Sequence, residues 1–589
     1  MLNAAAAASV RYISEERTPV TNDAHRRPRR LVLAALAVAL AVVAASCGGS
    51  DDSSGAAATT SAGARGGTLV FGATADPIAL DGALVSDGES LRAVAQMFET
   101  LVSLKPGTTE VVPGLAERWE ASNGGKTWAF TLRDGVTFHD GTALDAEAVC
   151  FNFDRWYGFT GSFQNPSASY YWQTVFGGFR KTEPDSGAPT TSLYAGCTAR
   201  DAVTPVIELT HPSASFLGAL SLPSFSIGSP KALEEYGADR GTVDEDGVFH
   251  PTGTYATEHP VGTGPFRFES WTRDDRLVLV RNEDYWAEPA RVDRLVIRPI
   301  SDNASRLQAL QTGEIQGFDF VEPQDLATIE DDDDLQLLDR PAFNVGYVGF
   351  NVSVPPLDDV KVRQAIAHAL DREDVVTSFY AGRGVVAKEF MPPEVVGYAD
   401  DVTEYPYDPA RAKQLLRESG LPSPVKLDFW YPSDVSRPYM PDPKRNFQAF
   451  AEDLEAVGFD VVPHTAPWSP DYVGRVTGGN AGGVYLFGWT GDFGDADNFV
   501  GTFFQAKSAQ WGFENPTLFR TLDDAEVETD PGRRTTLYEE ANRMIMDFLP
   551  GVPYVHTKPA LAFRADVKGY VPSPVSLESF ATVTLGRSG

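Results

Sequence analysis

Three carboxylates stand close together in the last quarter of the chain, at Asp492, Asp495 and Asp497. Side chains of this type bind calcium in loops that supply oxygen ligands at fixed positions. The spacing here does not fit such a loop, because Phe499 occupies the next ligand position and no glutamate closes the loop. We therefore expect no metal at these carboxylates.

The short motifs of enzymes are also missing from the sequence. There is no G-x-S-x-G nucleophile elbow and no H-E-x-x-H zinc motif. The eight histidines are scattered, without a pair at metal-ligand spacing. Gly125-Lys126-Thr127 imitates the end of a phosphate-binding loop, but Glu120 stands where that loop needs its first glycine. We expect a protein without enzymatic activity, cofactor or metal, while a triad built from distant residues would leave no motif of this kind.

The N-terminus has the pattern of an exported, lipid-anchored protein. Basic residues at 25–30 (HRRPRR) precede an apolar run of thirteen residues, Leu31 to Val43, which is too short to span a bilayer but suits the core of a signal peptide. Small residues then lead to Cys47, and the whole resembles a bacterial lipoprotein signal, in which the cysteine is acylated. An ordinary secretory cleavage site beside an incidental cysteine is the alternative. We predict a signal peptide with an N-terminal extension over residues 1–47 and a flexible tether over residues 48–66.

Two further cysteines are present, Cys150 and Cys197. An exported protein folds in an oxidising compartment, where an even pair of cysteines favours a disulfide. We predict a bond between these two residues, although their spacing in the sequence does not show that their Cα atoms come within reach.

The composition is that of a folded, acidic, multidomain protein. A chain of 589 residues exceeds what one hydrophobic core can organise, and 42% hydrophobic with 22% charged residues is ordinary for a globular fold. The 49 basic and 81 acidic residues give a net charge of −32. Such a surface repels nucleic acid and anionic lipid headgroups, so we expect no nucleic-acid partner and no membrane contact apart from the lipid anchor.

Helix and strand patterns alternate along the globular part of the chain, which favours layered α/β domains. The clearest helix is predicted at 408–420, because Asp408 suits its N-cap, Pro409 its first position and Gly420 its end. Periodicity predicts further helices at 90–101, 145–153, 362–370, 447–457 and 537–548, and strands at 68–72, 127–132, 206–209, 277–280, 292–300 and 459–462.

Four separate blocks of the chain carry a family signature. Residues 113–155 read PGLAERWEASNGGKTWAFTLRDGVTFHDGTALDAEAVCFNFDR, residues 261–286 read VGTGPFRFESWTRDDRLVLVRNEDYW, residues 310–315 read LQTGEI, and residues 344–364 read NVGYVGFNVSVPPLDDVKVRQ. In content and order they resemble the extracytoplasmic solute-binding proteins of ABC-type importers for peptides and nickel (family 5). The likeness runs from about Gly67 to Pro574.

The resemblance implies a two-lobed α/β fold of the periplasmic-binding-protein type, with a ligand cleft between the lobes. On this basis we expect lobe I at 67–300, lobe II at 301–555, and a return to lobe I at 556–589. The resemblance also implies a monomeric receptor. Together with the lipoprotein signal at Cys47, it predicts a protein held by lipid at the outer face of the plasma membrane, in the periplasmic space if a second membrane is present. Such a receptor delivers its ligand to a membrane permease and its ATPase subunits.

Two segments resemble the members of this family that bind dipeptides. One is Arg437-Pro438-Tyr439, and the other is GWTGDFGD at 488–495. In dipeptide receptors the arginine of the first segment binds the ligand carboxylate, and the first aspartate of the second binds the ligand ammonium. The resemblance assigns these roles to Arg437 and Asp492, with Tyr439, Trp489 and Gly491 lining the site.

Such a pair of charges suits a dipeptide, which is a zwitterion. Taking either charged end out of water without a partner is costly, whereas a guanidinium pairs with a carboxylate and a carboxylate pairs with an ammonium. Each additional residue lengthens a peptide by about 3.3–3.6 Å, so two charges at a fixed separation select ligand length. The structural alternatives are a surface ion pair for Arg437 and a turn cap for Asp492.

We therefore interpret the chain as the ligand-binding lipoprotein of an ABC-type importer for dipeptides or short peptides. A longer oligopeptide, a nickel chelate, an oligosaccharide or another small solute is the alternative within this class. A lipid-anchored extracellular hydrolase, which would turn a peptide over, and a signalling or adhesion module, which would not respond to small ligands, are the alternatives outside it.

Overall fold

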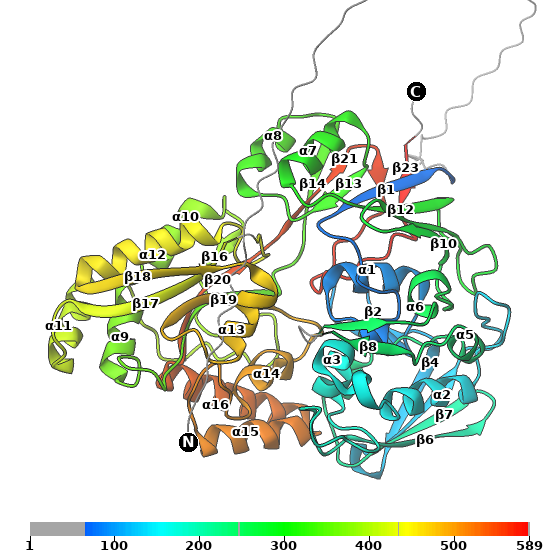
Figure 1. Ribbon diagram of the computed structural model, residues 1–589, viewed down its shortest axis with the longest axis horizontal. Helices are drawn as coiled ribbons and strands as arrows, with labels where there is room; N and C mark the ends of the chain where they lie inside the picture. The colour runs from blue at the N-terminus through cyan, green and yellow to red at the C-terminus, as the bar shows by residue number, and fades with distance from the viewer. Residues whose placement is uncertain (1–64, 245–247, 434, 587–589) are drawn as a thin grey trace, which may run out of the picture. The chain divides into compact units, whose positions relative to one another are not determined.

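The computed structural model describes residues 65–244, 248–433 and 435–586, which form a mixed α/β structure with several sheets (Figure 1). The α/β fold class predicted from the alternating patterns is confirmed. The predicted signal peptide and Cys47 lie outside the described residues. Within the described ranges, no helix combines the length and the apolar character needed to cross a membrane.

One sheet has seven strands and draws on both ends of the described chain. β1 lies at its centre, parallel to β12 and β13, while β21 pairs antiparallel with β13 and β14. In order, the strands are β10 (Phe266–Thr272), β11 (Arg276–Arg281), β12 (Arg294–Pro299), β1 (Thr68–Ala73), β13 (Gly317–Asp319), β21 (Ala560–Arg564) and β14 (Leu335–Asp339). β13 and β14 follow residue 300, where we expect the boundary between lobes, and the lobe limits stay a prediction.

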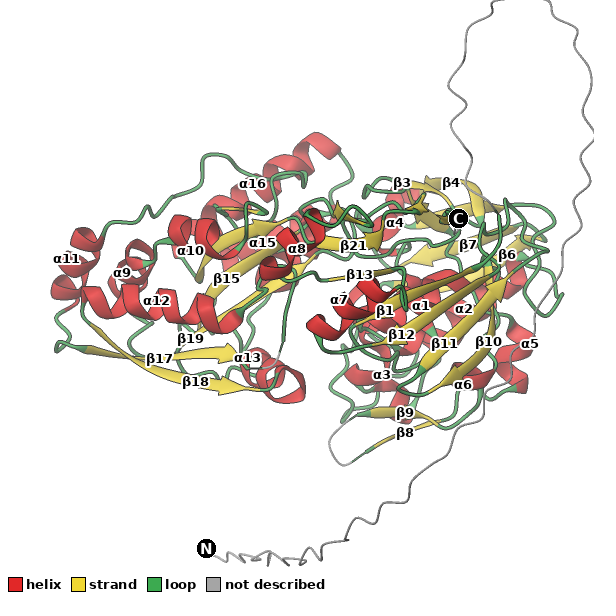
Figure 2. Cartoon of the chain, turned by 90° about the horizontal axis from the view of Figure 1, so that it is seen from above, coloured by secondary structure: helices red, strands yellow, loops and turns green. Residues whose placement is uncertain are grey.

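A second sheet has six strands and lies in the part of the chain that carries the proposed ligand residues. Its strands, in order, are β16 (Gly384–Val385), β20 (Gly551–Thr557), β15 (Asn344–Phe350), β19 (Val484–Thr490), β17 (Val425–Pro432) and β18 (Phe459–Ala466). β15 and β20 are buried along their whole length. α12 (Pro443–Val457) packs along β17 and β18 (Figures 1 and 2).

The remaining strands form small sheets in the first half of the chain and near its C-terminus. The largest has the order β4 (Ala116–Ser122), β5 (Thr127–Leu132), β7 (Thr204–Leu209) and β6 (Tyr194–Asp201). The two-stranded pairs are β2 (Val102–Leu104) with β3 (Val111–Pro113), β8 (Gly241–Val243) with β9 (Phe249–Pro251), and β22 (Val567–Lys568) with β23 (Thr584–Leu585).

The helices fill the segments between these strands. Those before β14 are α1 (Gly88–Met97), α2 (Ala146–Tyr157), α3 (Pro166–Val175), α4 (Phe216–Ala219), α5 (Pro230–Glu235), α6 (Tyr255–Glu258), α7 (Asn303–Thr312) and α8 (Leu326–Glu330). Those after β15 are α9 (Val360–Ala369), α10 (Arg372–Phe379), α11 (Pro409–Ser419), α12, α13 (Val473–Thr477), α14 (Val500–Phe504), α15 (Pro516–Val527) and α16 (Pro531–Phe548).

Local capping explains why some helix bounds follow from the sequence and others do not. α11 has the predicted limits, because the Asp408 side chain accepts from the backbone N–H of Arg411 and Gly420 adopts a left-handed φ of 74°. α1 is shorter than the predicted helix 90–101, since it ends at Met97, whose carbonyl accepts a hydrogen bond from Gly264 N at 2.9 Å. The apolar period beyond Met97 therefore belongs to buried residues outside the helix.

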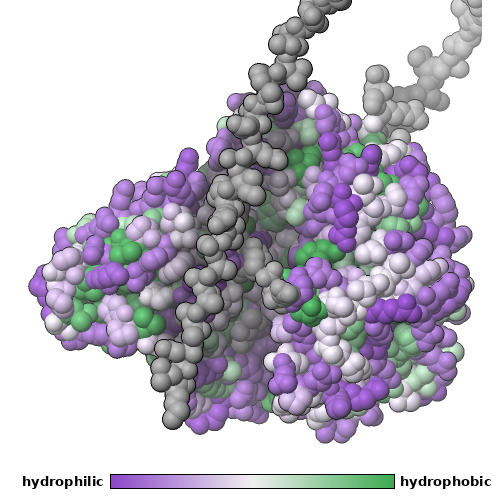
Figure 3. Space-filling view, viewed as in Figure 1, coloured by the Kyte–Doolittle hydropathy of each residue, from purple (hydrophilic) through white to green (hydrophobic). Residues whose placement is uncertain are grey.

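Two large hydrophobic clusters matter for the site. The N-terminal cluster consists of buried apolar residues between Ala79 and Ala256. The C-terminal cluster consists of those between Phe343 and Val555, with Val575. Phe493 lies three residues after the end of β19, a strand of the C-terminal cluster, yet its side chain packs in the N-terminal cluster. On the face drawn in Figure 3, hydrophilic residues predominate and hydrophobic ones are scattered, as expected for a chain with 81 acidic and 49 basic residues.

The chain passes between the two large sheets at two places. It leaves the seven-stranded sheet after β14, enters the six-stranded sheet at β15, and returns between β20 and β21. The two connections lie side by side, because Arg340 N donates to the carbonyl of Pro559 at 2.9 Å and Thr557 N donates to Asn344 Oδ1 at 3.0 Å. A rotation of one sheet relative to the other would therefore bend both connections together.

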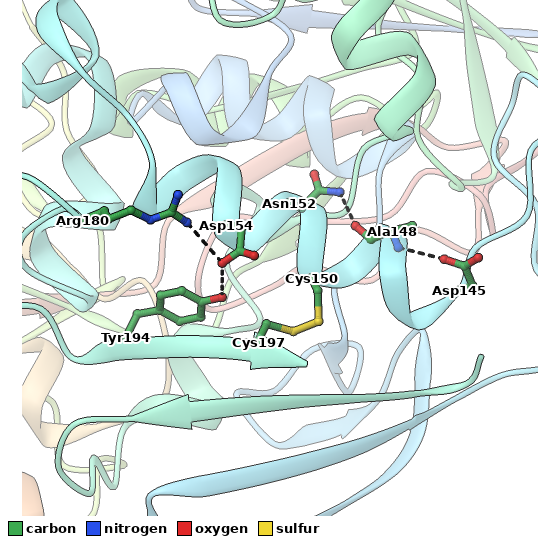
Figure 4. The surroundings of a disulfide bond; sticks show 8 residues. All are labelled: Asp145, Ala148, Cys150, Asn152, Asp154, Arg180, Tyr194 and Cys197. Atoms are coloured by element: carbon green, nitrogen blue, oxygen red, sulfur yellow. Dashed lines mark hydrogen bonds and ion pairs between the residues drawn. A yellow bond between two sulfur atoms is a disulfide. The ribbon is translucent and has the colours of Figure 1, made fainter. Parts of the chain in front are cut away.

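Cys150 of α2 and Cys197 of β6 form a disulfide, with their Cα atoms 5.2 Å apart (Figure 4). The bond fastens α2 to the sheet on which it packs. Tyr194 of β6 adds a hydrogen bond of 2.9 Å from its hydroxyl to Asp154 of α2. The pair of cysteines that the sequence singled out is thus joined between a helix and a strand.

Reduction of this disulfide is expected to lower the free energy of unfolding by about 4 kcal/mol, because the bond closes a long loop and restricts the unfolded chain. Denaturant unfolding with and without a reductant measures the change. A variant carrying both Cys150→Ser and Cys197→Ser should unfold identically in the two conditions. Two labelled thiols in the unfolded, unreduced extracellular protein would show that the bond does not form.

Candidate functional site

The loop after β19 carries three of the predicted site residues. Trp489 lies in the last part of β19, and Gly491 and Asp492 follow that strand directly. Gly491 N donates to the carbonyl of Phe343 at 2.9 Å, and a Cβ on this glycine would stand 2.2 Å from the Phe343 ring and 2.7 Å from the Phe499 ring. Only glycine fits this close approach, so Gly491 lets the loop turn towards Asp492.

Asp492 is a carboxylate surrounded by neutral hydrogen-bond donors. The Tyr171 hydroxyl donates to its Oδ1 at 2.9 Å, and Asn498 Nδ2 donates to its Oδ2 at 3.2 Å. Burial raises the pKa of Asp492 to about 6, and the hydrogen bonds from Asn498 and Tyr171 oppose that rise. Asp492 makes no ion pair with any residue that the structure describes. The site therefore holds a negative charge that lacks a counter-ion.

Arg437 is a cation in a comparable position. Its backbone forms a short turn, in which Arg437 N donates to Met440 O at 3.0 Å and Met440 N to Arg437 O at 2.9 Å. The guanidinium lies over the indole ring of Trp468, with Cζ 4.3 Å from the ring centroid. Its Nε is buried without a hydrogen-bond partner, and among the described residues no carboxylate lies within ion-pair distance. Burial lowers the pKa of Arg437, while Tyr439 and Glu89 oppose that effect.

Aromatic contacts bring the Arg437 segment to the same end of β19 as Asp492. The Trp468 ring stacks on Phe487 of β19 with centroids 5.2 Å apart. The Tyr439 ring fills the space beside Gly488, since a Cβ on that glycine would stand 2.3 Å from Tyr439 Cδ2. The two segments that the sequence singled out thus meet at Gly488, against which the Tyr439 ring packs.

Two predicted lining residues have structural contacts of their own. Tyr439 is only 5% exposed, and its backbone carbonyl accepts hydrogen bonds from the hydroxyls of Tyr380 at 3.0 Å and Tyr554 at 3.2 Å. Trp489 is half-buried against Phe503, with ring centroids 5.6 Å apart. Their role towards a ligand stays a prediction.

Three residues of this site were not predicted from the sequence. Tyr171 lies on α3 and is 321 positions away from Asp492 in the sequence, so no local pattern predicts their contact. Trp468 follows β18, and its indole, which stacks on Phe487 of β19, lies under the Arg437 guanidinium. Asn498 lies six positions after Asp492, where a polar residue ending an Asp-rich loop is a signal that could have been read.

The loop also touches the first half of the chain. Phe493 lies against Gly218, whose Cβ would stand 3.2 Å from the Phe493 ring, and Gly494 lies against Thr109 in the turn between β2 and β3. Together with Tyr171, these contacts place residues from both halves of the chain around Asp492. A ligand bound at Asp492 would therefore contact both halves.

One cavity is lined by one of the predicted site residues, and another lies apart from them. Arg437 lines a cavity of about 40 Å³ with Ser436, Pro438 and Thr557, which is large enough for water but too small for a peptide. Another cavity of about 360 Å³ lies between the end of α1, the β2–β3 turn and residues 569–582, and none of the predicted site residues line it. The site is therefore defined by its unpaired charges rather than by an open cavity.

Proteins of known family are similar to this chain over most of its length. The family model for bacterial extracellular solute-binding proteins, family 5 (middle), matches residues 110–511. The dipeptide-binding protein of Escherichia coli is 34% identical over 530 residues, which cover 88% of this chain and 94% of that protein. Heme-binding protein A of Haemophilus influenzae is 33% identical over 533 residues, which cover 88% of this chain and 92% of that protein.

Solved structures of peptide complexes have the same fold. The ABC transporter-associated periplasmic binding protein of Helicobacter pylori in complex with the peptide STSA gives a TM-score of 0.74 at 28% sequence identity, covering 89% of this chain and 99% of that one. A dipeptide-binding protein of Pseudoalteromonas in complex with Met-Leu gives 0.73 at 26% identity, covering 88% of this chain and 100% of that one. The fold implied by the resemblance is therefore confirmed.

Proposed function

We propose a function that starts from one premise: the chain belongs to the bacterial extracellular solute-binding proteins of family 5. Proteins of this family bind solutes outside the cytoplasm and are not enzymes. On that basis the chain is the ligand-binding component of an ABC-type importer, and it captures dipeptides or short peptides. It then delivers them to a membrane permease that works with ATPase subunits.

The observation that carries this proposal is the pair of unpaired, largely buried charges at Asp492 and Arg437. An isolated buried charge is unfavourable, so a ligand group of opposite charge would stabilise each of these side chains. The ammonium of a peptide provides the partner of Asp492, and its carboxylate provides the partner of Arg437. The hydrogen bond that Tyr171 donates to Asp492 leaves lone pairs of that carboxylate free for the ammonium.

Ligand binding would be coupled to a change in the arrangement of the two halves. We propose lobes at 67–300 with 556–589 and at 301–555, with β13 and β14 sharing the sheet of the first lobe. Because residues from both halves surround Asp492, a bound peptide favours the closed arrangement by the difference between its affinities for the closed and open states. The permease would recognise the closed, loaded receptor.

The heme-binding relative makes a porphyrin the second candidate ligand. A heme carries two carboxylates and no ammonium. It could pair with Arg437, but it would leave the Asp492 carboxylate without a partner. The site chemistry therefore favours a zwitterion.

Mass spectrometry of the small molecules that co-purify with the protein tests the ligand class directly. We expect peptides, and added dipeptide should raise the melting temperature, with about 2.7 kcal/mol of stabilisation at 100 times the dissociation constant. A stronger response to a pentapeptide would replace dipeptides by oligopeptides. Co-purified heme, together with a melting temperature that no peptide raises, would refute the proposed ligand.

The affinity for a dipeptide is expected to fall as the pH drops below 6. The pKa of Asp492 in the ligand-free protein is raised to about 6, so protons compete with the ligand ammonium below that value. Ionised Asp492 is the form that binds, so the dissociation constant should rise about tenfold per pH unit below the pKa. Calorimetry between pH 5 and 7 measures this, because both ends of the dipeptide are predominantly charged in that range. A dissociation constant that does not change with pH would exclude an ionised Asp492 from the site.

The lipid anchor at Cys47 is the remaining part of the proposed function. Cys47 lies outside the described residues, and the proposal is supported by the basic, apolar and small-residue segments that precede it. Cys47→Ser should move the protein from the membrane fraction of its native host to the soluble fraction. Cys150→Ser is the matched control and should leave the protein with the membrane. An unmodified Cys47 in the wild type would refute the anchor.

A further inference from the structure

Both the oxygen and the nitrogen of the Asn498 side-chain amide form hydrogen bonds with the proposed ligand residues. Its Oδ1 accepts from the backbone N of Asp492 at 2.7 Å and from Trp489 Nε1 at 3.4 Å. Its Nδ2 donates to Asp492 Oδ2 at 3.2 Å. The residue is 4% exposed, so water cannot replace these bonds if they are lost.

The backbone of Asn498 is held in place from a distant helix. Asn498 is the last residue of the short helix η7 (Ala496–Asn498), and the Asp495 side chain caps that helix by accepting from Asp497 N at 2.9 Å. Arg534 of α16 donates two hydrogen bonds, of 2.6 and 2.8 Å, to the Asp495 carboxylate. This bidentate geometry fixes the orientation of Asp495 and, through η7, that of Asn498.

We infer that Asn498 is a positioning residue for the ligand-ammonium site, which fixes the Asp492 carboxylate and the Trp489 indole in one arrangement. The inference rests on the proposed function, in which Asp492 receives the ammonium. A carboxylate offers about four lone-pair sites, and Asn498 and Tyr171 each occupy one of those on Asp492. The remaining sites are thereby aimed where the ammonium binds.

Asn498 also favours the ionised form of Asp492. Of the two hydrogen bonds that oppose the burial-driven rise in the pKa of Asp492, the one from Asn498 is the larger. The titratable groups facing Asp492 from α3 are Tyr170, whose pKa burial raises to about 12, and Tyr171, whose pKa burial raises further. On the loop itself, Asp495 is paired with Arg534, and burial with the nearby Asp495 charge raises the pKa of Asp497 to about 7. Loss of the Asn498 amide should therefore raise the pKa of Asp492.

A pH series of dialanine binding by calorimetry tests this role with three variants. Asn498→Ala removes all three hydrogen bonds, and Asn498→Asp keeps the acceptor but replaces the donor by a carboxylate. Asn152→Ala is the matched control, since Asn152 is 1% exposed and makes three hydrogen bonds, to Ala148 O, Gly228 O and Gly228 N, but none to a proposed ligand residue.

Asn498→Ala should weaken dialanine binding at pH 7 by about tenfold and move the pH at which affinity begins to fall upward by about one unit. Asn152→Ala should lower the melting temperature without changing either quantity. An Asn498→Ala protein with unchanged affinity and unchanged pH dependence would overturn the inference. If that variant does not fold, Asn498→Asp should show the same upward movement of the pH dependence, and its absence would overturn the inference as well.

The titration of the Asp492 carboxyl in ligand-free protein separates this inference from the proposed function. Carbon-13 NMR follows that titration without any ligand, and the Asn498 variants should shift it upward by about one pH unit. If Asp492→Asn binds dialanine as tightly as the wild type, the proposed role of Asp492 fails. A titration of Asp492 that Asn498→Ala leaves unmoved refutes the positioning role itself.

Discussion

Asp492→Asn is expected to weaken dipeptide binding at pH 7.5 by about 100-fold or more. The substitution keeps the size of the side chain and removes its charge, so the ligand ammonium would be buried without a counter-ion. Losing one partner of a desolvated charge pair typically costs several kcal/mol, and a 100-fold change corresponds to about 2.7 kcal/mol. Calorimetry with one dipeptide measures the difference.

Asp453→Asn is the matched control for this substitution. Burial raises the pKa of Asp453 to about 6, as it does for Asp492, but Asp453 lies on α12 and accepts a hydrogen bond from Asp371 N at 2.9 Å. Its substitution should leave dipeptide affinity unchanged. In addition, Asp492→Asn should be far less sensitive to N-acetylation of the ligand than the wild type. A tenfold or smaller loss of affinity in Asp492→Asn would contradict the assigned ammonium site.

Arg340→Met is expected to lower the free energy of unfolding by about 3–5 kcal/mol, the usual consequence of breaking a buried ion pair. Arg340 is 1% exposed and lies in the connection between β14 and β15. Its Nε donates to Glu578 at 2.6 Å, and its Nη2 donates to Glu578 and to Asp319, both at 3.1 Å. Removing the guanidinium leaves two fully buried carboxylates with Arg92 as their remaining cation.

Denaturant unfolding measures this loss, and Arg411→Met provides the control. The Arg411 side chain on α11 is 41% exposed and stands 3.9 Å from Glu418 in a surface ion pair. Its removal should change the free energy of unfolding by about 0.5 kcal/mol at most. Equal stabilities for the Arg340 and Arg411 variants would mean that the buried network does not stabilise the connection between the sheets.

Local features of the fold were predictable from the sequence. The bounds of α11 follow from Asp408 and Gly420, because a cap is a contact between residues a few positions apart. β5 has the predicted limits, Thr127–Leu132, because alternation marks a half-buried strand. The sheet order was not predictable, since β21 joins β13 and β14 only when the C-terminal part of the chain returns.

The same distinction applies to the candidate site. Arg437 and Asp492 were found because each lies in a short segment with a family resemblance. Tyr171 was not, because its hydrogen bond to Asp492 depends on how the two halves of the chain meet. Trp468 reaches Arg437 through the packing of aromatic rings on β19, which no spacing in the sequence encodes. Residues that support a site by tertiary contacts need the structure.

Calorimetry with dialanine, N-acetyl-dialanine, dialanine amide and pentaalanine tests the account most directly. Acetylation removes the charge that would pair with Asp492, and amidation removes the one that would pair with Arg437. We expect each blocked dipeptide to bind at least about 100-fold more weakly than dialanine, and Arg437→Ala to abolish most of the effect of amidation. Pentaalanine should bind more weakly than dialanine as well. Equal affinity for dialanine and its N-acetylated form would contradict the central claim that Asp492 binds a peptide ammonium.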